Sequence, residues 1–276
     1  MKWYKNPMLV FGIGLAVFAA GALFYNPRLS VFILLASVLA GSGVAYAFLK
    51  YIQPKGGHLF INTVVSTLIA FLLLNPALSL SFENVAWAFL GGAAVILAKV
   101  GPQFKRQVIF NPAALGLLGL SLLMTLVYGN DALLPTFVSW WGTDFGGYLA
   151  LIILLPLISY AAYKFRKIYL VTAFLAFNAV WLYFYGGVEA LVYPYTTGTL
   201  YFLAGVMLLE PKTSPTKKIG QIVAALVAVM AYRYAYVIGF NNVELWAIIA
   251  VNVVNLLSKL RLSKIFKNLN SKHVSN

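Results

Sequence analysis

The chain consists of long apolar runs separated by short polar segments. A helix needs about 20 apolar residues to cross the hydrocarbon core of a bilayer, and ten runs meet this requirement. They cover residues 8–25, 29–50, 59–75, 84–100, 108–128, 147–164, 167–186, 190–209, 218–238 and 242–262. The pattern therefore predicts an all-α integral membrane protein with ten transmembrane helices.

The longest polar connection follows the fifth run and divides the chain into two halves of five spans. Because each half has an odd number of spans, two copies of one fold would have opposite orientations in the membrane, as in many transporters. The sequence thus predicts two inverted repeats of five helices. We expect the first repeat over 1–128, an extracytoplasmic connection over 129–146, the second repeat over 147–262 and a basic cytoplasmic tail over 263–276.

Two spans at matching places in the halves echo each other. "STLIAFLLLNPALS" (66–79) and "GTLYFLAGVMLLEPKTS" (198–214) both begin with a hydroxyl residue and Leu, and both reach a polar residue followed by Pro. Proline ends or kinks a helix, and short, Pro-interrupted spans in corresponding positions point to a binding site near the midplane. An ordinary pair of helix ends explains the same pattern. The candidate binding residues on these two spans are Thr67, Thr196, Thr197, Gly198 and Thr199.

Composition and charge agree with a membrane protein. The chain is 62% hydrophobic and 9% charged, with a mean hydropathy of +0.88, far from the usage of soluble domains. When the ten spans are placed across the membrane in order, all but two of the 20 lysines and arginines lie on one side of it. Every acidic residue except Glu210 lies on the other side. This split follows the positive-inside rule. It predicts a multi-pass protein with cytoplasmic N- and C-termini, and we expect the membrane to be a prokaryotic cell membrane.

The same charges exclude several functions. The net charge of +14 lies in loops rather than on a basic face of a soluble fold, so nucleic acid is not an expected partner and the lipid bilayer is. The chain has no cysteine, and both histidines, His58 and His273, lie in polar flanks. Cysteine-ligated zinc, iron–sulfur clusters and a bis-His haem inside the membrane are therefore excluded. We expect no metal site, no catalytic residue and, because no acid lies mid-span, no carboxylate proton relay.

A few polar residues occur within or beside the spans. Asn111 and Pro112 begin the fifth span, where Asn is a good N-cap and Pro suits the first turn; a helix N-terminus there also suits an anionic group. Arg233 lies within an apolar run, so it needs a partner or a function unless it snorkels to the interface. Three asparagines are candidates for hydrogen bonds between helices: Asn178, Asn252 and Asn255.

Three stretches of the chain together resemble one family. "AKVGPQFKRQVIFNPAALG" (98–116), "LLEPKTSPTKKIGQIV" (208–223) and "AYRYAYVIGFNNVELWAIIAVNVV" (231–254) are similar, in this order, to blocks of the NqrB/RnfD family. These are membrane flavin subunits of sodium-translocating NADH:quinone oxidoreductase and of Rnf electron-transport complexes. The third block resembles the family's intramembrane Arg and its downstream Glu and Asn, which correspond to Arg233, Glu244 and Asn252 in this chain.

The resemblance implies a flavin-binding subunit that passes electrons in an ion-translocating redox complex. It implies FMN or riboflavin as the cofactor and other membrane redox subunits as partners. Family members attach FMN to the threonine of a Ser-Gly-Ala-Thr motif, whereas this chain has "TTGTL", with Thr199 eleven residues before Glu210. Thr199 is still the candidate for covalent attachment, but we expect non-covalent flavin because the motif is not reproduced. The cofactor residues expected are the five named above, with Asn111, Pro112, Arg233 and Asn252.

Other interpretations are open from the sequence. The same inverted-repeat cavity suits a membrane transporter or channel for a small solute such as a flavin, without redox turnover. A structural scaffold would bind no ligand. Glu210 is the only acid on the basic side, so an ion pair with Lys212 or Lys217 is a competing explanation for the end of that span.

Overall fold

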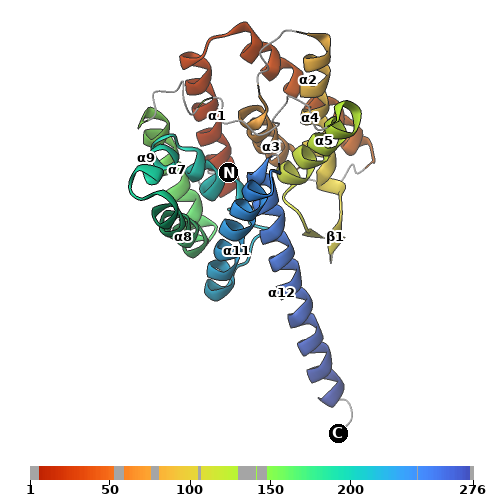
Figure 1. Ribbon diagram of the computed structural model, residues 1–276. Coiled ribbons are helices and arrows are strands. Elements are labelled where there is room, and N and C mark those ends of the chain that lie inside the picture. The colour runs from red at the N-terminus through yellow and green to blue at the C-terminus, as the bar shows by residue number, and fades with distance from the viewer. Residues whose placement is uncertain are drawn as a thin grey trace.

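The computed structural model describes residues 6–52, 59–75, 81–104, 107–129, 141, 148–240 and 242–273. Within these residues the fold is almost entirely helical (Figure 1). The first half contains α1 (Pro7–Tyr25), α2 (Leu29–Ile52), α3 (Leu59–Leu73), α4 (Phe82–Leu97) with the 3-10 turn η2 (Ala98–Val100), and α5 (Pro112–Tyr128). A two-residue hairpin of β1 (Gln103–Phe104) and β2 (Gln107–Val108) precedes α5.

The second half contains α7 (Tyr148–Lys164), α8 (Ile168–Gly186), α9 (Glu189–Thr196), α10 (Thr199–Phe202), the π-helix η3 (Leu203–Met207), α11 (Lys218–Val237) and α12 (Val243–His273). The run predicted as one span over 190–209 is therefore broken into α9, α10 and η3. The tail predicted from residue 263 is helical as far as His273, and α12 projects away from the rest of the bundle (Figure 1). Of the predicted connection 129–146, only Gly129 and Trp141 lie within the described residues.

The outer surface of the bundle is apolar. Phe24, Leu126 and Phe184 are each at least 80% exposed, and many other large apolar side chains face outward. An apolar surface of this extent is expected where lipid, not water, is the solvent. Among the described residues, α1, α2, α8, α11 and residues 243–260 of α12 are long and apolar enough to cross a membrane, and α3, α4, α5 and α7 are shorter apolar helices. The described residues thus form an almost entirely helical membrane protein.

The helices pack in a pattern that recurs between the halves. In the first half α2 packs on α4 and α4 on α5; in the second, α8 packs on α11 and α11 on α12. Two further contacts join the halves, α1 with α7 and α5 with α12. In this packing pattern α2, α4 and α5 of the first half match α8, α11 and α12 of the second half.

The contact between α5 and α12 is reciprocal. The Asn111 backbone N–H, just before α5, donates to Asn252 Oδ1 at 2.7 Å. Asn242, just before α12, donates from Nδ2 to Ser121 Oγ at 2.6 Å. Ser121 lies ten residues after Asn111, and Asn252 lies ten residues after Asn242. The residue just before each helix is therefore bonded to the equivalent position of the other helix. Two copies related by a twofold axis make contacts of this kind.

The α2–α4 contact depends on glycine. A Cβ on Gly41 would lie 1.9 Å from the Phe89 carbonyl oxygen, and one on Gly92 would lie 2.4 Å from the Val38 carbonyl oxygen. The two backbones therefore approach as closely as small residues permit, which is how helices in membranes gain packing energy.

We predict that Gly41→Ala lowers the stability of the protein, because the added methyl group must push α4 away from α2. Overpacking of this kind costs about 1–3 kcal/mol. The thermal unfolding midpoint in detergent measures it. The matched control is Gly43→Ala, two residues further along α2, where a Cβ would meet nothing within 4 Å. Equal midpoints for the two variants would show that the α2–α4 contact is not tight.

Candidate functional site

The threonine cluster lies at the break between α9 and α10. Gly198 has φ +79°, a left-handed conformation that favours glycine, and it lies just before α10, two residues after the end of α9. Thr197 Oγ1 donates to Thr199 Oγ1 at 3.5 Å, and Thr196 Oγ1 donates to the Val192 carbonyl at 2.8 Å. The sequence-predicted residues 196–199 thus form one turn in which Thr196 already has a backbone partner.

Trp141 packs beside this turn. Its side chain is fully buried, and a Cβ on Gly198 would lie 3.3 Å from its ring. Trp141 Nε1 donates to the Leu72 carbonyl at 3.0 Å, close to the end of α3. The indole also packs against Phe18 and Phe202, with ring centroids 4.9 and 5.3 Å away. One side chain from the connection between the halves therefore joins the end of α3 to the start of α10.

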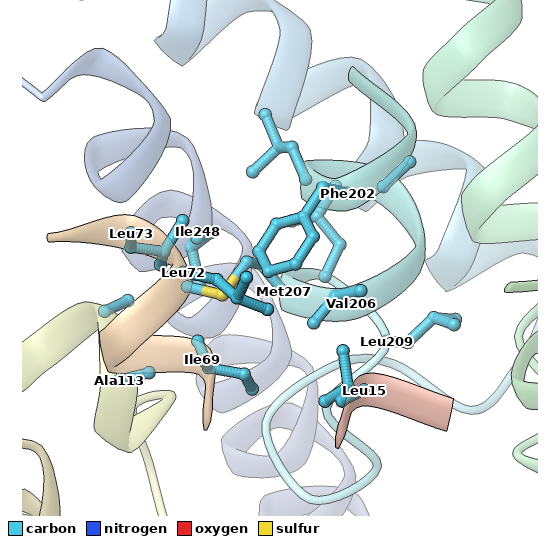
Figure 2. Packing of buried hydrophobic residues seen from close by; sticks show 14 of the residues in the cluster. Leu15, Ile69, Leu72, Leu73, Ala113, Phe202, Val206, Met207, Leu209 and Ile248 are labelled. Atoms are coloured by element: carbon cyan, nitrogen blue, oxygen red, sulfur yellow. The ribbon is translucent and has the colours of Figure 1, made fainter. Parts of the chain in front are cut away.

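The centre of the molecule, where the two interrupted spans meet, is apolar. Figure 2 shows Phe202 and Met207 beside Leu72 and Ile248, which come from α3 and α12. Leu72 and Met207 have no exposed surface. The contact between these two spans is therefore apolar.

Arg233 has a partner in the neighbouring helix. Its Nη2 donates to Asn178 Oδ1 at 2.5 Å, so α11 and α8 are joined by a charged hydrogen bond. Because a guanidinium only donates, the accepting atom of Asn178 must be its oxygen, and its Nδ2 points elsewhere. Asn178 Nδ2 and Arg233 Nε are both buried and have no hydrogen-bond partner. The pair therefore holds two unused N–H donors.

Tyrosines surround the Arg233–Asn178 pair. The guanidinium lies over the Tyr232 ring at 4.9 Å, and Tyr195 is among its electrostatic neighbours. Tyr195 donates from its hydroxyl to the Leu175 carbonyl at 2.5 Å and packs edge to face on Tyr201 at 6.0 Å. Since Tyr195 immediately precedes the threonine turn, the structure brings Arg233 near residues 196–199. The cluster therefore combines N–H donors with aromatic rings.

A second cluster of polar side chains binds backbone carbonyls at the end of η3 and in the segment that follows it. Asn111 caps α5 as predicted, accepting from the backbone N–H groups of Ala113 and Ala114, while its Nδ2 donates to the Met207 carbonyl at 3.0 Å. Asn252 Nδ2 donates to the Thr213 carbonyl at 3.0 Å. The predicted residues Asn111 and Asn252 are therefore together, and both bind backbone rather than an open pocket.

The next carbonyls along this segment are bound from other helices. Lys167, only 1% exposed, donates from Nζ to the Ser214 carbonyl at 2.7 Å and to the Pro215 carbonyl at 2.6 Å. Gln221 Nε2 donates to the Thr216 carbonyl at 3.0 Å. We call Asn111, Asn252, Lys167 and Gln221 the carbonyl clamp. Together with Lys259, which donates to the Lys212 carbonyl at 3.2 Å, the clamp satisfies a segment that has left the helix.

Two ionisable groups at or near the carbonyl clamp, Lys167 and Glu210, have shifted pKa values. Burial lowers the pKa of Lys167 to about 8; the nearby Lys259 adds to that effect and Glu210 opposes it. Burial raises the pKa of Glu210, and the ammonium groups of Lys99, Lys212 and Lys167 oppose that shift. The charges near Glu210 include Lys212, which is close to it in sequence, and two lysines from other parts of the chain, Lys99 and Lys167.

Two predicted residues belong to neither group. Pro112, the first residue of α5, directly follows Asn111 of the carbonyl clamp and has no N–H to donate. Thr67, on α3, donates from Oγ1 to the Thr63 carbonyl at 2.9 Å. Sequence reasoning did not single out Trp141 or Lys167. Lys167 resembles any positive-inside lysine of its loop, and Trp141 lies in a polar connection, so neither had a distinguishing signal.

No protein-family model and no curated protein matches this sequence.

We predict that Lys167→Met destabilises the protein by roughly 2–3 kcal/mol, because two buried carbonyls lose a charged donor. The thermal midpoint in detergent measures the effect. Lys164→Met is the matched control, since Lys164 is exposed three residues earlier, and surface changes of this kind cost within about 0.5 kcal/mol. Equal midpoints for the two variants would mean that Lys167 does not hold the 214–215 backbone.

Proposed function

We propose that the chain crosses the membrane ten times, in two inverted halves of five segments with both termini in the cytoplasm. Three observations support this arrangement: the sorting of basic loops, the recurring helix pairs and the reciprocal contact between α5 and α12. In this arrangement α3 corresponds to α9, α10 and η3. Thr67 and Thr199 are then equivalent positions, and only the second copy is broken at its threonine.

We further propose that the protein is a flavin-binding membrane subunit that passes electrons in an ion-translocating redox complex similar to the NqrB/RnfD family. The observation that carries this proposal is the pair of unused donors, Arg233 Nε and Asn178 Nδ2, among tyrosines and near the threonine turn. An isoalloxazine ring carries carbonyl and ring-nitrogen acceptors, and its reduced form gains negative charge. A fixed guanidinium favours that form.

The residues have distinct roles in this proposal. Arg233 and Asn178 bind the acceptor edge of the flavin, and Tyr195 and Tyr201 pack on its ring system. Thr197, Gly198 and Thr199 bind the ribityl chain or phosphate, with the flavin held non-covalently as FMN or riboflavin. The flavin supplies the electron transfer, and the residues of this chain bind it, orient it and exclude water from it. Other membrane redox subunits would deliver and remove electrons.

We predict that the purified protein absorbs at about 370 and about 450 nm, as oxidised flavin does, and that the colour is released on denaturation. Arg233→Gln should reduce retained flavin roughly tenfold or more, because hydrogen bonds from a charged group are the strong ones. Arg28→Gln, at an exposed arginine, is the control. Flavin that survives denaturation and disappears in Thr199→Val would instead indicate a covalent bond.

Two results would contradict the proposal. A colourless protein that binds neither added FMN nor added riboflavin would exclude a flavin site. Bound flavin whose spectrum never changes on reduction would exclude electron transfer and favour a transporter for the flavin.

A further inference from the structure

The last helix of the chain extends well beyond the bundle. Within α12, Val243–Leu260 is long and apolar enough to cross a membrane. Residues 261–273 continue the same helix, and Figure 1 shows this part of α12 standing clear of the other helices. At 1.5 Å per residue it adds about 20 Å of helix. We call residues 261–273 the α12 extension.

Hydrogen bonds fix the point from which the α12 extension leaves the bundle. Asn252 Nδ2 donates to the Thr213 carbonyl at 3.0 Å, and Lys259 Nζ donates to the Lys212 carbonyl at 3.2 Å. Lys259 Nζ also donates to Gln107 Oε1 at 3.3 Å. Because α12 is held by side chains as far as Lys259, this anchor sets the direction in which the extension projects.

The α12 extension continues in line with the apolar span. Sharp kinks in helices usually occur at proline, at glycine–serine pairs or at π-bulges. α12 is one continuous α-helix, and its sequence contains neither proline nor glycine. The extension therefore does not turn at the end of the span to lie along the surface of the membrane that the span would cross.

The sequence of the α12 extension is both basic and amphipathic. All its charged residues are positive: Arg261, Lys264, Lys267 and Lys272. Its apolar residues recur at intervals of three and four positions, which in a helix lie along one face: Leu262, Ile265, Phe266 and Leu269. A surface that complements this segment is apolar at its centre and negatively charged at its border.

The placement of the extension distinguishes between the surfaces that could cover it. Most helical stability in proteins comes from packing of an amphipathic face, and a helix of this length is marginal in water without it. A second copy of the chain would bring an equally positive extension, and like charges repel. An anionic bilayer has suitable chemistry, but the extension projects in line with the span. A protein with an acidic surface fits both the charge and the direction.

We propose that the α12 extension is a docking element for a protein partner with an apolar groove bordered by Asp and Glu side chains. Recognition is then of the helix-in-groove kind. Lys212, Lys217 and Lys218 are exposed near the base of the extension and give it the same sign of charge, which favours association with an acidic partner. The proposal does not depend on the flavin function, and its test measures no flavin.

Calcium-loaded calmodulin is a suitable probe, because its apolar groove accepts basic amphipathic helices. The chain has no cysteine, so Ser263→Cys can carry a single environment-sensitive dye on the full-length protein in phosphatidylcholine nanodiscs. We expect the probe to cause a saturable blue shift of the dye emission that weakens as salt is added. Absence of a shift would overturn the proposal.

Matched variants test which residues bind the probe. Lys264→Glu combined with Lys267→Glu should weaken binding roughly tenfold or more, because attraction becomes repulsion. Lys50→Glu combined with Lys164→Glu makes the same charge change at exposed lysines of the bundle and should alter binding by about twofold at most, since salt screens distant charges. Equal weakening by the two pairs would show general charge attraction and overturn the proposal.

The apolar face and the other occupants are tested on the same labelled protein. Phe266→Ser should weaken binding of the probe, whereas Asn268→Ser, off the apolar face, should bind it as the unaltered protein does. A blue shift without the probe in nanodiscs that contain phosphatidylglycerol would assign the extension to the membrane surface instead. A dimer in native mass spectrometry that Phe266→Ser removes would assign it to a second copy. Either result would overturn the proposal.

Discussion

The fold depends on satisfying backbone carbonyls that an interrupted helix leaves unpaired away from water. The chain leaves regular helix after Met207, and several carbonyls of the segment that follows accept hydrogen bonds from side chains elsewhere in the chain. The carbonyl clamp supplies donors from α11, from α12 and from the residues just before α5 and α8. Because an unpaired polar group is costly in an apolar environment, this set of donors fixes where the end of η3 lies. The threonine turn at the other end of the same short span is thereby positioned as well.

Against this background the groups that lack protein partners become informative. Among the described residues, the buried side-chain atoms without a hydrogen-bond partner are Thr63 Oγ1, Lys99 Nζ, Asn178 Nδ2, Thr213 Oγ1 and Arg233 Nε. Asn178 and Arg233 are bonded to each other, so two of these unused donors lie in one cluster among tyrosines. The proposed flavin site is based on that pair.

Local sequence signals predicted much of the architecture. Asn111 and Pro112 indicated a capped helix start, the proline of "LLEPKTSPT" indicated where a span stops, and Arg233 was recognisable as a charge in need of a partner. The break at Gly198 was not predicted, because one glycine within an apolar run does not distinguish a turn from a packed helix. The helix that continues to His273 was also missed, since the charged composition there suggested a tail.

Long-range pairings could not be read from the sequence. Asn178 and Arg233 lie 55 residues apart, and Lys167 reaches Ser214 across 47 residues. No local pattern states which asparagine meets which arginine. The same holds for the reciprocal contact between α5 and α12, whose two hydrogen bonds span 141 and 121 residues. Such contacts follow from the way the helices pack.

The most direct test of the mirrored arrangement is the accessibility of single cysteines in intact cells. The chain has no cysteine of its own, so one can be introduced at Gln103, before α5, and one at Gly239, before α12; both positions are exposed. The account predicts that a membrane-impermeant thiol reagent labels the cysteine at 239 from outside and reaches the one at 103 only after the cells are opened. Labelling of both from the same side would contradict the inverted relation of the halves.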